Sequence, residues 1–328
     1  MQAVQATRFG GPSVLGVVEL PDPEPGPGEI AIDVTHAAVG LVDVFFRQGR
    51  YRDLPGMPRP PFVPGLEVAG TVRALGEGVS GLAVGEEVVS MSAAGVGGYA
   101  SVYIAPVTRV ASTRGSGIAP ALAVAAVPNA AMAQVALTRA AHLAEGESVL
   151  VHGALGGFAA AFPGMARRLG ASRVVGSVRA GRLAAARATR LPYDRVVDSA
   201  ELAEALAGET FDVVVDPVGG AVRTRSLDVM APGGRLLAVG NASGDWDHRL
   251  DSNELWRGSL TVSGFNSGAY LPRHPRYIRP ALDAALAVVA AGQADGVLDV
   301  LPFSEAATAH ERMEDRALDG RIVLTPDA

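Results

Sequence analysis

The sequence predicts an α/β protein in which a barrel-like antiparallel β domain precedes a doubly wound parallel sheet of the Rossmann type. The first third of the chain is rich in Gly, Pro and Val, and Pro/Gly turns separate its short apolar runs, which is typical of antiparallel strands. An Ala-rich helical segment follows at residues 119–143, and strands then alternate with helices, which favours a parallel sheet. A glycine loop at residues 153–159 comes directly after the first of these strands.

Composition narrows the class of protein. The 328 residues suit two domains, and 48% of them are apolar. A net charge of −6 without a basic stripe argues against nucleic-acid binding, and the lack of an uninterrupted apolar run of about 20 residues argues against a membrane span. The N-terminus has no signal-peptide pattern, so a soluble cytoplasmic protein is expected. The sequence contains no Cys, which excludes disulfides and thiolate metal sites.

Three segments make up the expected domain organisation. The first domain covers residues 1–118, where residues 17–40 and residues 65–91 both read as strand, turn and strand. The second domain covers residues 119–262, and residues 263–328 are expected to return to the first domain. Strands are expected in the second domain and at its end over residues 148–153, 173–178, 194–199, 211–220, 233–244 and 260–265, with helices at 158–170 and 181–190.

The loop Gly153-Ala154-Leu155-Gly156-Gly157-Phe158-Ala159 predicts a dinucleotide site. Glycine lets the backbone approach a pyrophosphate, and the following helix start offers free N–H groups. Phe158 and Pro163 complicate this prediction, because Phe158 stands beside the pyrophosphate position and Pro163 falls inside the following helix. For a working site the helix is expected to start beside Gly156-Gly157, with Phe158 pointing into the domain and Pro163 absorbed as a kink further on. The alternative is a late start with Pro163 in the first turn, which would move the anion-binding N–H groups of the helix away from the loop.

The end of the second strand of this unit should contact the ribose of a nucleotide. NAD-specific proteins usually have Asp or Glu there, whereas this chain has Ser177, Arg179 and Arg182. The planar fork of Arg matches phosphate oxygens, so the two arginines favour NADP over NAD. The alternative is that both are solvated residues at a helix start.

Seven short segments in order span nearly the whole chain. They are DVFFRQGRY at 43–51, PGLEVAG at 64–70, GGYA at 97–100, VLVHGA at 149–154, DPVGG at 216–220, GFNSGAY at 264–270 and GRIVLTP at 320–326. Together they resemble the zinc-free branch of the medium-chain dehydrogenase/reductase superfamily, the NADPH:quinone oxidoreductases, which is also similar to polyketide enoyl reductase domains.

The resemblance implies a GroES-like catalytic domain, split in sequence around a central Rossmann cofactor domain. It implies NADPH as cofactor and hydride transfer to a small-molecule quinone or α,β-unsaturated carbonyl in the interdomain cleft. It also implies a homodimer joined through the edge strand from Leu260 to Phe265. Zinc-dependent relatives have a His where Leu66 stands and a Cys early in the chain, so no metal is expected.

Tyr51 is the expected catalytic residue, since its phenol could donate a proton to the substrate oxygen as hydride arrives, although it could also only stack on the substrate. Asp43 could orient a neighbouring group or serve as a structural hydrogen-bond acceptor. Asn129 is expected to contact the substrate, whereas packing is expected for Trp246 and Trp256. The expected cofactor contacts are Gly153, Gly156, Gly157, Phe158, Ser177, Arg179, Arg182, Asn241, Phe265 and Ser267.

Departures from the family pattern leave a second function open. Gly40 stands where the family has an Asn, Ala133 where it has a Thr, and Ala159 where the glycine loop usually ends in Gly. Together with Phe158 and Pro163, these changes remove several expected cofactor contacts. The alternative to a reductase is therefore a redox-inactive member that catalyses cyclisation, isomerisation or elimination, or only binds a small molecule.

Overall fold

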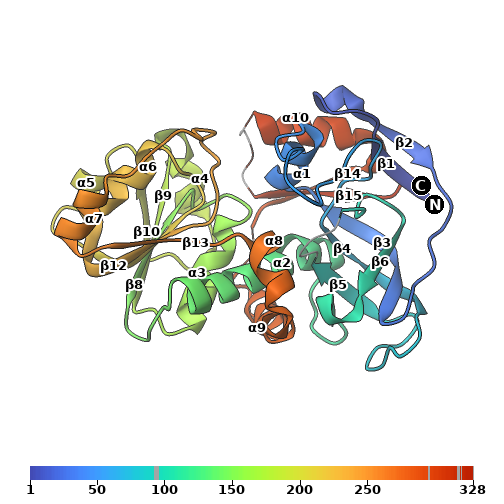
Figure 1. Cartoon of the computed structure of the whole chain (residues 1–328). Coiled ribbons are helices and arrows are strands. Elements are labelled where there is room, and N and C mark those ends of the chain that lie inside the picture. Colours follow the sequence, from blue (N-terminus) through green and yellow to red (C-terminus); the bar gives the residue numbers. More distant parts are fainter. Residues whose placement is uncertain (92–95, 295, 316–317, 319, 328) are drawn as a thin grey trace.

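The computed structural model describes residues 1–91, 96–294, 296–315, 318 and 320–327. Two lobes, each built on its own large sheet, lie side by side, with α2 (Pro120–Val135), α8 (Ser267–Tyr270) and α9 (Ile278–Ala290) between them (Figure 1). The predicted α/β class is confirmed.

One lobe contains a mostly antiparallel sheet with the order β14-β15-β3-β4-β5-β7, in which β6 also pairs with β3. β15 runs antiparallel to β3 with Val323 opposite Ala38, so the C-terminal strand completes a sheet that the N-terminal part began. The strands are β3 (Glu29–Ala38), β4 (Glu67–Leu75), β5 (Glu87–Met91), β6 (Val102–Pro106), β7 (Val110–Ser112), β14 (Leu298–Pro302) and β15 (Arg321–Thr325), beside a ribbon of β1 (Gln2–Ala6) and β2 (Leu15–Glu19).

The other lobe contains a six-stranded sheet in which every pair of neighbours is parallel. Its strands are β8 (Ser148–His152), β9 (Arg173–Val178), β10 (Arg195–Asp198), β11 (Phe211–Asp216), β12 (Met230–Ala238) and β13 (Thr261–Gly264). The order β10-β9-β8-β11-β12-β13 is that of a doubly wound Rossmann sheet, as predicted. The winding reverses between β8 and β11, and such sheets bind ligands at the carboxyl ends of the strands at this point.

Alanine-rich helices join the two lobes. The small side chains of α2 let α9 pack closely against it, and both contribute to one large core that also includes β8 and β11. The stretch Pro120–Ala140 is long and apolar enough to cross a membrane, but 72% of its most apolar window is buried inside the protein, as in a core helix. The remaining helices are α1 (Leu41–Arg47), α3 (Phe162–Arg168), α4 (Leu183–Ala188), α5 (Leu202–Ala205), α6 (Ala221–Arg225), α7 (Ser252–Gly258) and α10 (Ala306–Glu314).

The domain limits at residues 118 and 262 stay predictions. β13 covers Thr261–Gly264 and belongs to the parallel sheet, so this sheet continues past residue 262. β14 and β15 belong to the antiparallel sheet.

Candidate functional site

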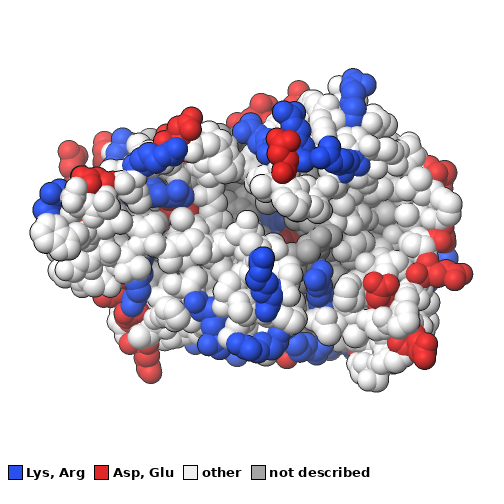
Figure 2. All heavy atoms as spheres, in the orientation of Figure 1, with Lys and Arg blue, Asp and Glu red and all other residues white. Residues whose placement is uncertain are grey.

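The candidate site lies in the recess that Figure 2 shows between the two lobes. Three loops at the carboxyl edge of the parallel sheet face this region: residues 153–158 after β8, residues 217–220 after β11 and residues 239–251 after β12. The opposite lobe contributes α1, because the ring of Phe45 contacts the ring of Trp246 with centroids 6.1 Å apart.

The glycine loop turns sharply after β8. Gly153 has φ +62°, which L side chains rarely adopt, and its carbonyl accepts a hydrogen bond from the Gly156 amide at 2.7 Å. Gly156 pairs with Gly320 in a parallel bridge, which engages the amide of Gly157, whereas the amide of Phe158 has no hydrogen-bond partner in the described part of the chain. A glycine turn with a free N–H group at the switch point of the sheet suits an anionic group such as a diphosphate.

The helix after this loop begins later than its sequence pattern suggests. Ala159–Ala161 form a single 3-10 turn, and the α-helix starts at Phe162 with Pro163 in its first turn. The structure thus has the late start, the second of the two alternatives, and Pro163 in the first turn removes no helical hydrogen bond. The early start expected beside Gly156-Gly157 is wrong, so the N–H groups nearest the loop belong to the loop and the 3-10 turn rather than to the α-helix. The ring of Phe158 packs on Phe162, with centroids 5.1 Å apart, and on the core of the lobe. Phe158 thus points into the domain rather than across the front of the loop.

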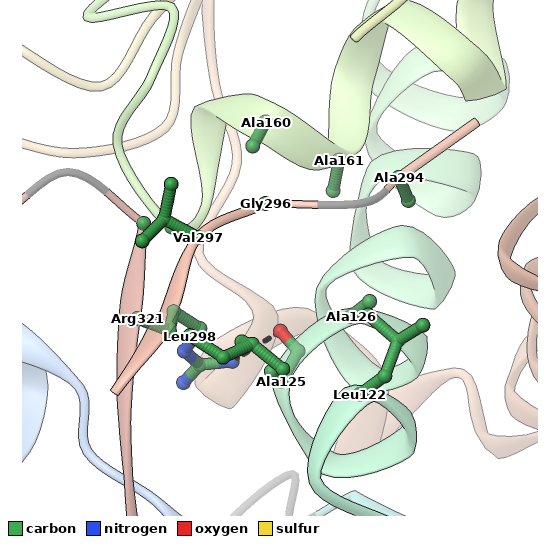
Figure 3. Close-up of a pocket in the computed structure, with 12 residues that line it drawn as sticks. Leu122, Ala125, Ala126, Ala160, Ala161, Ala294, Gly296, Val297, Leu298 and Arg321 are labelled. Atoms are coloured by element: carbon green, nitrogen blue, oxygen red, sulfur yellow. Dashed lines mark hydrogen bonds between the residues drawn. The ribbon is translucent and has the colours of Figure 1, made fainter. Parts of the chain in front are cut away.

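Arg321 supports the glycine loop from the other lobe. A Cβ added at Gly157 would lie 2.5 Å from Cγ of Arg321, so only glycine fits beside this side chain. Arg321 forms a buried ion pair with Glu67 at 2.6 Å and donates to the carbonyl of Ala125 at 3.0 Å (Figure 3). The loop is therefore held against a fixed cation rather than against a mobile surface.

Asn129, expected at the substrate, contacts the glycine loop instead. Its Nδ2 atom donates to the carbonyl of Gly157 at 2.9 Å, and only 4% of the residue is exposed. A cavity of about 20 Å³, room for one water molecule, lies nearby. Its lining comes from α2, the loop and the first residues of β14 and β15, and comprises Leu122, Ala125, Ala126, Gly157, Ala160, Ala161, Ala294, Gly296, Val297, Leu298, Gly320 and Arg321.

The carboxyl end of β9 presents the two arginines predicted to bind phosphate. Arg179 follows β9 directly, and with Gly181 and Arg182 it lines an open hollow of about 210 Å³. Ser177 does not reach this hollow, because it is fully buried and its hydroxyl lies 2.6 Å from Nδ1 of His152. Burial lowers the pKa of His152 to about 4, so this residue is a neutral core histidine.

Two further loops are tied together at the crevice. The buried carboxylate of Asp216 accepts from the amide of Gly219 at 2.8 Å and from Nε of Arg223 at 2.6 Å. Arg223 also donates to the carbonyl of Gly240 at 2.9 Å, which links the loop after β11 to the loop after β12. The side chain of Asn241 lies over Gly219, where its Oδ1 would be 2.4 Å from an added Cβ. This contact places Asn241 at the carboxyl edge of the sheet.

Asp43 lies in a buried network rather than on the recess surface. Its carboxylate accepts from the amides of Gly40 at 2.8 Å and Gly65 at 3.2 Å, and from the hydroxyl of Tyr99 at 3.2 Å. The same hydroxyl is 3.2 Å from Nε2 of His310, whose pKa falls to about 3 because of its burial. Burial also raises the pKa of Asp43 to about 7. These contacts favour the structural alternative for Asp43.

Tyr51 lies just beyond α1 and is partly exposed. Its ring contacts Phe45 and Phe46 at centroid distances of 5.9 and 5.6 Å. Burial raises the pKa of its phenol. Among the described residues its hydroxyl has no hydrogen-bond partner, so the phenol is protonated and available to a ligand.

Phe265 and Ser267 follow β13 at the same edge of the sheet. The amide of Phe265 donates to the carbonyl of Ala238 at 2.9 Å, and its ring contacts Tyr270 with centroids 5.6 Å apart. Ser267 is the first residue of the short helix α8, whose N-cap Asn266 accepts from the amide of Ala269 at 3.3 Å.

Sequence reasoning missed two residues of this region. The sequence predicted Arg321 only as part of a strand. Its contacts could not be predicted, because its partners Ala125 and Glu67 are 196 and 254 residues away in the chain. The packing expected for Trp256 is wrong, because it is 78% exposed, whereas Trp246 is 50% exposed and packs in part on Phe45. The aromatic contact of Trp246 with the opposite lobe had no signal in the local sequence.

Two family models match the chain. The alcohol dehydrogenase GroES-like domain matches residues 26–115, and the zinc-binding dehydrogenase model matches residues 189–324. Both matches agree with the split arrangement of the two sheets.

Curated relatives and solved structures are also similar. A 2-haloacrylate reductase from a Burkholderia species is 30% identical over 329 residues, which are 98% of this chain and 98% of that protein. A mycocerosic acid synthase-like polyketide synthase of Mycobacterium tuberculosis is 32% identical over 92% of this chain, but the chain spans only 14% of that protein's length. The Escherichia coli quinone oxidoreductase complexed with NADPH is similar in structure, with a TM-score of 0.85, 26% identity and coverage of 99% of this chain and 100% of that one.

Proposed function

This chain belongs to the medium-chain dehydrogenase/reductase superfamily, and we propose that it reduces a quinone or another α,β-unsaturated carbonyl with NADPH. The observation that carries the proposal is the glycine loop with the free amide of Phe158, at the switch point of a Rossmann-ordered sheet. A related quinone oxidoreductase whose structure contains NADPH is similar over its whole length, which supports the same cofactor here.

The residues of the crevice fit NADPH in three places. The glycine loop with the free amide of Phe158 suits the diphosphate, and the hollow beside Arg179 and Arg182 suits the 2′-phosphate of the adenosine ribose. The loop that bears Asn241 borders the place expected for the nicotinamide. Bound NADPH supplies the hydride for the reduction.

Tyr51 is proposed as the proton donor. As hydride reaches the β-carbon of a conjugated carbonyl, negative charge develops on the carbonyl oxygen, which then takes up a proton. The phenol of Tyr51 stays protonated because burial raises its pKa, and its hydroxyl has no other partner among the residues that the structure describes. Asp43 is proposed as a positioning residue, since its contacts hold the start of α1, the segment around Gly65 and the hydroxyl of Tyr99.

A labelled cofactor tests the reduction directly. NADPH deuterated at nicotinamide C4 is mixed with the protein and either menadione or an enone, and the products are analysed by mass spectrometry and NMR. We expect NADPH oxidation that depends on the acceptor, and deuterium at the β-carbon of the reduced enone. An enone that is cyclised or isomerised without deuterium, while NADPH is not consumed, would establish the non-redox alternative instead.

We further propose a homodimer that joins the two parallel sheets through β13. This strand lies at the end of the sheet order, so its outer edge has backbone groups free to pair with a second copy. Sedimentation equilibrium should give twice the monomer mass, and Val262→Pro on this edge should give a monomer. A monomer in the unmodified protein would refute the assembly without affecting the reductase proposal.

A further inference from the structure

Three aromatic side chains from the two lobes meet at the recess. Phe45 of α1 makes edge-to-face contacts with Tyr51 at 5.9 Å and with Trp246 at 6.1 Å between centroids. Trp246 comes from the loop after β12, which also contains Asn241. Half of the Trp246 residue is exposed, whereas Phe45 and Tyr51 are partly buried. The guanidinium of Arg50 lies over the ring of Phe45, 5.2 Å from its centroid, so the exposed apolar surface comes mainly from Trp246.

The loop holds Trp246 in place from both sides. On one side, Nδ2 of Asn241 donates to the carbonyl of Asp245 at 3.1 Å. On the other side, the hydroxyl of Thr224 on α6 lies 2.8 Å from Nε2 of His248. Because Asp245, directly before Trp246, and His248, two residues after it, are anchored, the backbone that carries the indole has little conformational freedom to lose when a ligand binds.

We propose that Phe45, Tyr51 and Trp246 form a clamp for the flat conjugated ring of the electron acceptor, with Trp246 as the specificity-determining residue. This proposal rests on the proposed function and narrows its substrate class to quinones and aryl enones. A planar π-system can stack on or meet the edges of these rings, and each aromatic pair contributes about three- to tenfold to affinity beyond the area it buries. An acyclic enone lacks a ring and gains only from apolar contact.

The position of the clamp links ring binding to the reaction. Tyr51 is both a member of the clamp and the proposed proton donor. Phe45 contacts both Tyr51 and Trp246, so a ring stacked on the exposed part of Trp246 lies on the same aromatic cluster as the phenol. Trp246 and Asn241 belong to one loop, so the same loop borders the expected place of the nicotinamide. A ring carbonyl in the clamp is therefore close to both partners of the reduction, whereas a flexible chain is not aligned by it.

Selectivity between two acceptors tests the clamp. The kcat/KM values for menadione and methyl vinyl ketone are compared in the natural protein, Trp246→Ala, Trp246→Phe and the control Trp256→Phe. Because the chain contains no Cys, methyl vinyl ketone cannot inactivate it by alkylating a thiol. We expect Trp246→Ala to lose about tenfold with menadione and less than twofold with methyl vinyl ketone, Trp246→Phe to recover most of the loss, and Trp256→Phe to match the natural protein. An equal change for both acceptors, or no change for menadione, would overturn the proposal.

Tryptophan fluorescence separates this proposal from the reductase activity. The chain has two Trp residues, so Trp256→Phe leaves Trp246 as the only indole reporter. In the presence of NADP⁺, we expect menadione to quench the fluorescence of Trp246 saturably in this variant. In Trp246→Phe, where Trp256 is the only indole, we expect only linear collisional quenching. Saturable quenching without turnover would support the clamp and defeat the reductase, whereas turnover with only linear quenching would defeat the clamp.

Discussion

Arg179 and Arg182 set the expected cofactor preference at the scale of single side chains. Replacing either by Ala should raise the Kd for NADPH about tenfold, the lower end for a charge-assisted contact, because solvent reaches the hollow. The Kd for NADH should change less than twofold, since NADH lacks the 2′-phosphate. Calorimetric titration measures both, with Arg187→Ala on the neighbouring helix α4 as a control. An equal loss for both nucleotides would remove these arginines from phosphate recognition.

Tyr51→Phe separates proton donation from stacking. The variant keeps the ring contacts with Phe45 and Phe46 and removes only the hydroxyl. If the phenol is the proton donor, kcat should fall by about 100-fold while KM changes little. Because burial raises the pKa of Tyr51, its loss should be equally severe from pH 6 to pH 9. An unchanged kcat would leave Tyr51 as a clamp residue only, with water as the proton source.

Asp43 should contribute to stability in a pH-dependent way. Asp43→Asn keeps the volume but turns an NH₂ group toward one of three donors, so the unfolding free energy should fall by about 1–3 kcal/mol at pH 5. The pKa of Asp43 is about 7 in the folded protein, above its unfolded value of 3.8. The unfolded chain therefore releases this proton first, and the natural protein loses stability as pH rises from about 4 to about 7.

Urea unfolding from pH 4 to pH 8 measures how the unfolding free energy changes with pH. The stability advantage of the natural protein over Asp43→Asn should shrink as the pH rises, because the variant has no carboxyl group to titrate at this position. Parallel pH profiles of the two proteins would show that Asp43 does not titrate with a raised pKa.

At the scale of elements, the sequence predicted what depends on local patterns. The strands of the parallel sheet and the glycine loop were found because glycine spacing and apolar runs are local. The start of α3 was left open between two alternatives, because Pro163 is compatible with a kink and with a first-turn position. Tertiary packing favours the late start of α3, since the rings of Phe158 and Phe162 both pack into the core.

The supports of the glycine loop could not be predicted in the same way. Arg321 and Asn129 reach Gly157 from distant parts of the chain, and no periodicity relates these positions. Likewise, Asp43 was recognised as a candidate acceptor, but its partners Tyr99 and His310 come from segments that meet only in the folded barrel. Contacts of this kind depend on the tertiary arrangement rather than on local propensity.

Gly157→Ala should disturb the loop without changing any charged group. The new Cβ would lie 2.5 Å from Cγ of Arg321, which cannot move easily because Glu67 and Ala125 hold its guanidinium. We expect a loss of about 1–3 kcal/mol in unfolding free energy and weaker NADPH binding. The control Gly16→Ala has nothing within 4 Å of the added Cβ and should behave like the natural protein. Normal stability of Gly157→Ala would show that Arg321 does not confine the loop.

At the scale of the whole molecule, each lobe supplies one half of the proposed reaction. The parallel sheet provides the crevice for the cofactor, and the antiparallel lobe provides Tyr51 and Phe45 on α1 and the segment that follows it. Arg321 contacts Gly157 and Trp246 contacts Phe45, so the lobes touch at two separate places. The relative position of the lobes therefore fixes both the glycine loop and the aromatic clamp.

The central claim is that this glycine loop binds NADPH although Phe158 and Pro163 depart from the family pattern. Calorimetric titration of the purified protein with NADPH, and with NADH for comparison, tests it most directly. The account predicts saturable binding of one NADPH per chain in the micromolar range, with NADH bound more weakly. No measurable binding at millimolar NADPH, in a protein that unfolds cooperatively and is therefore folded, would contradict it.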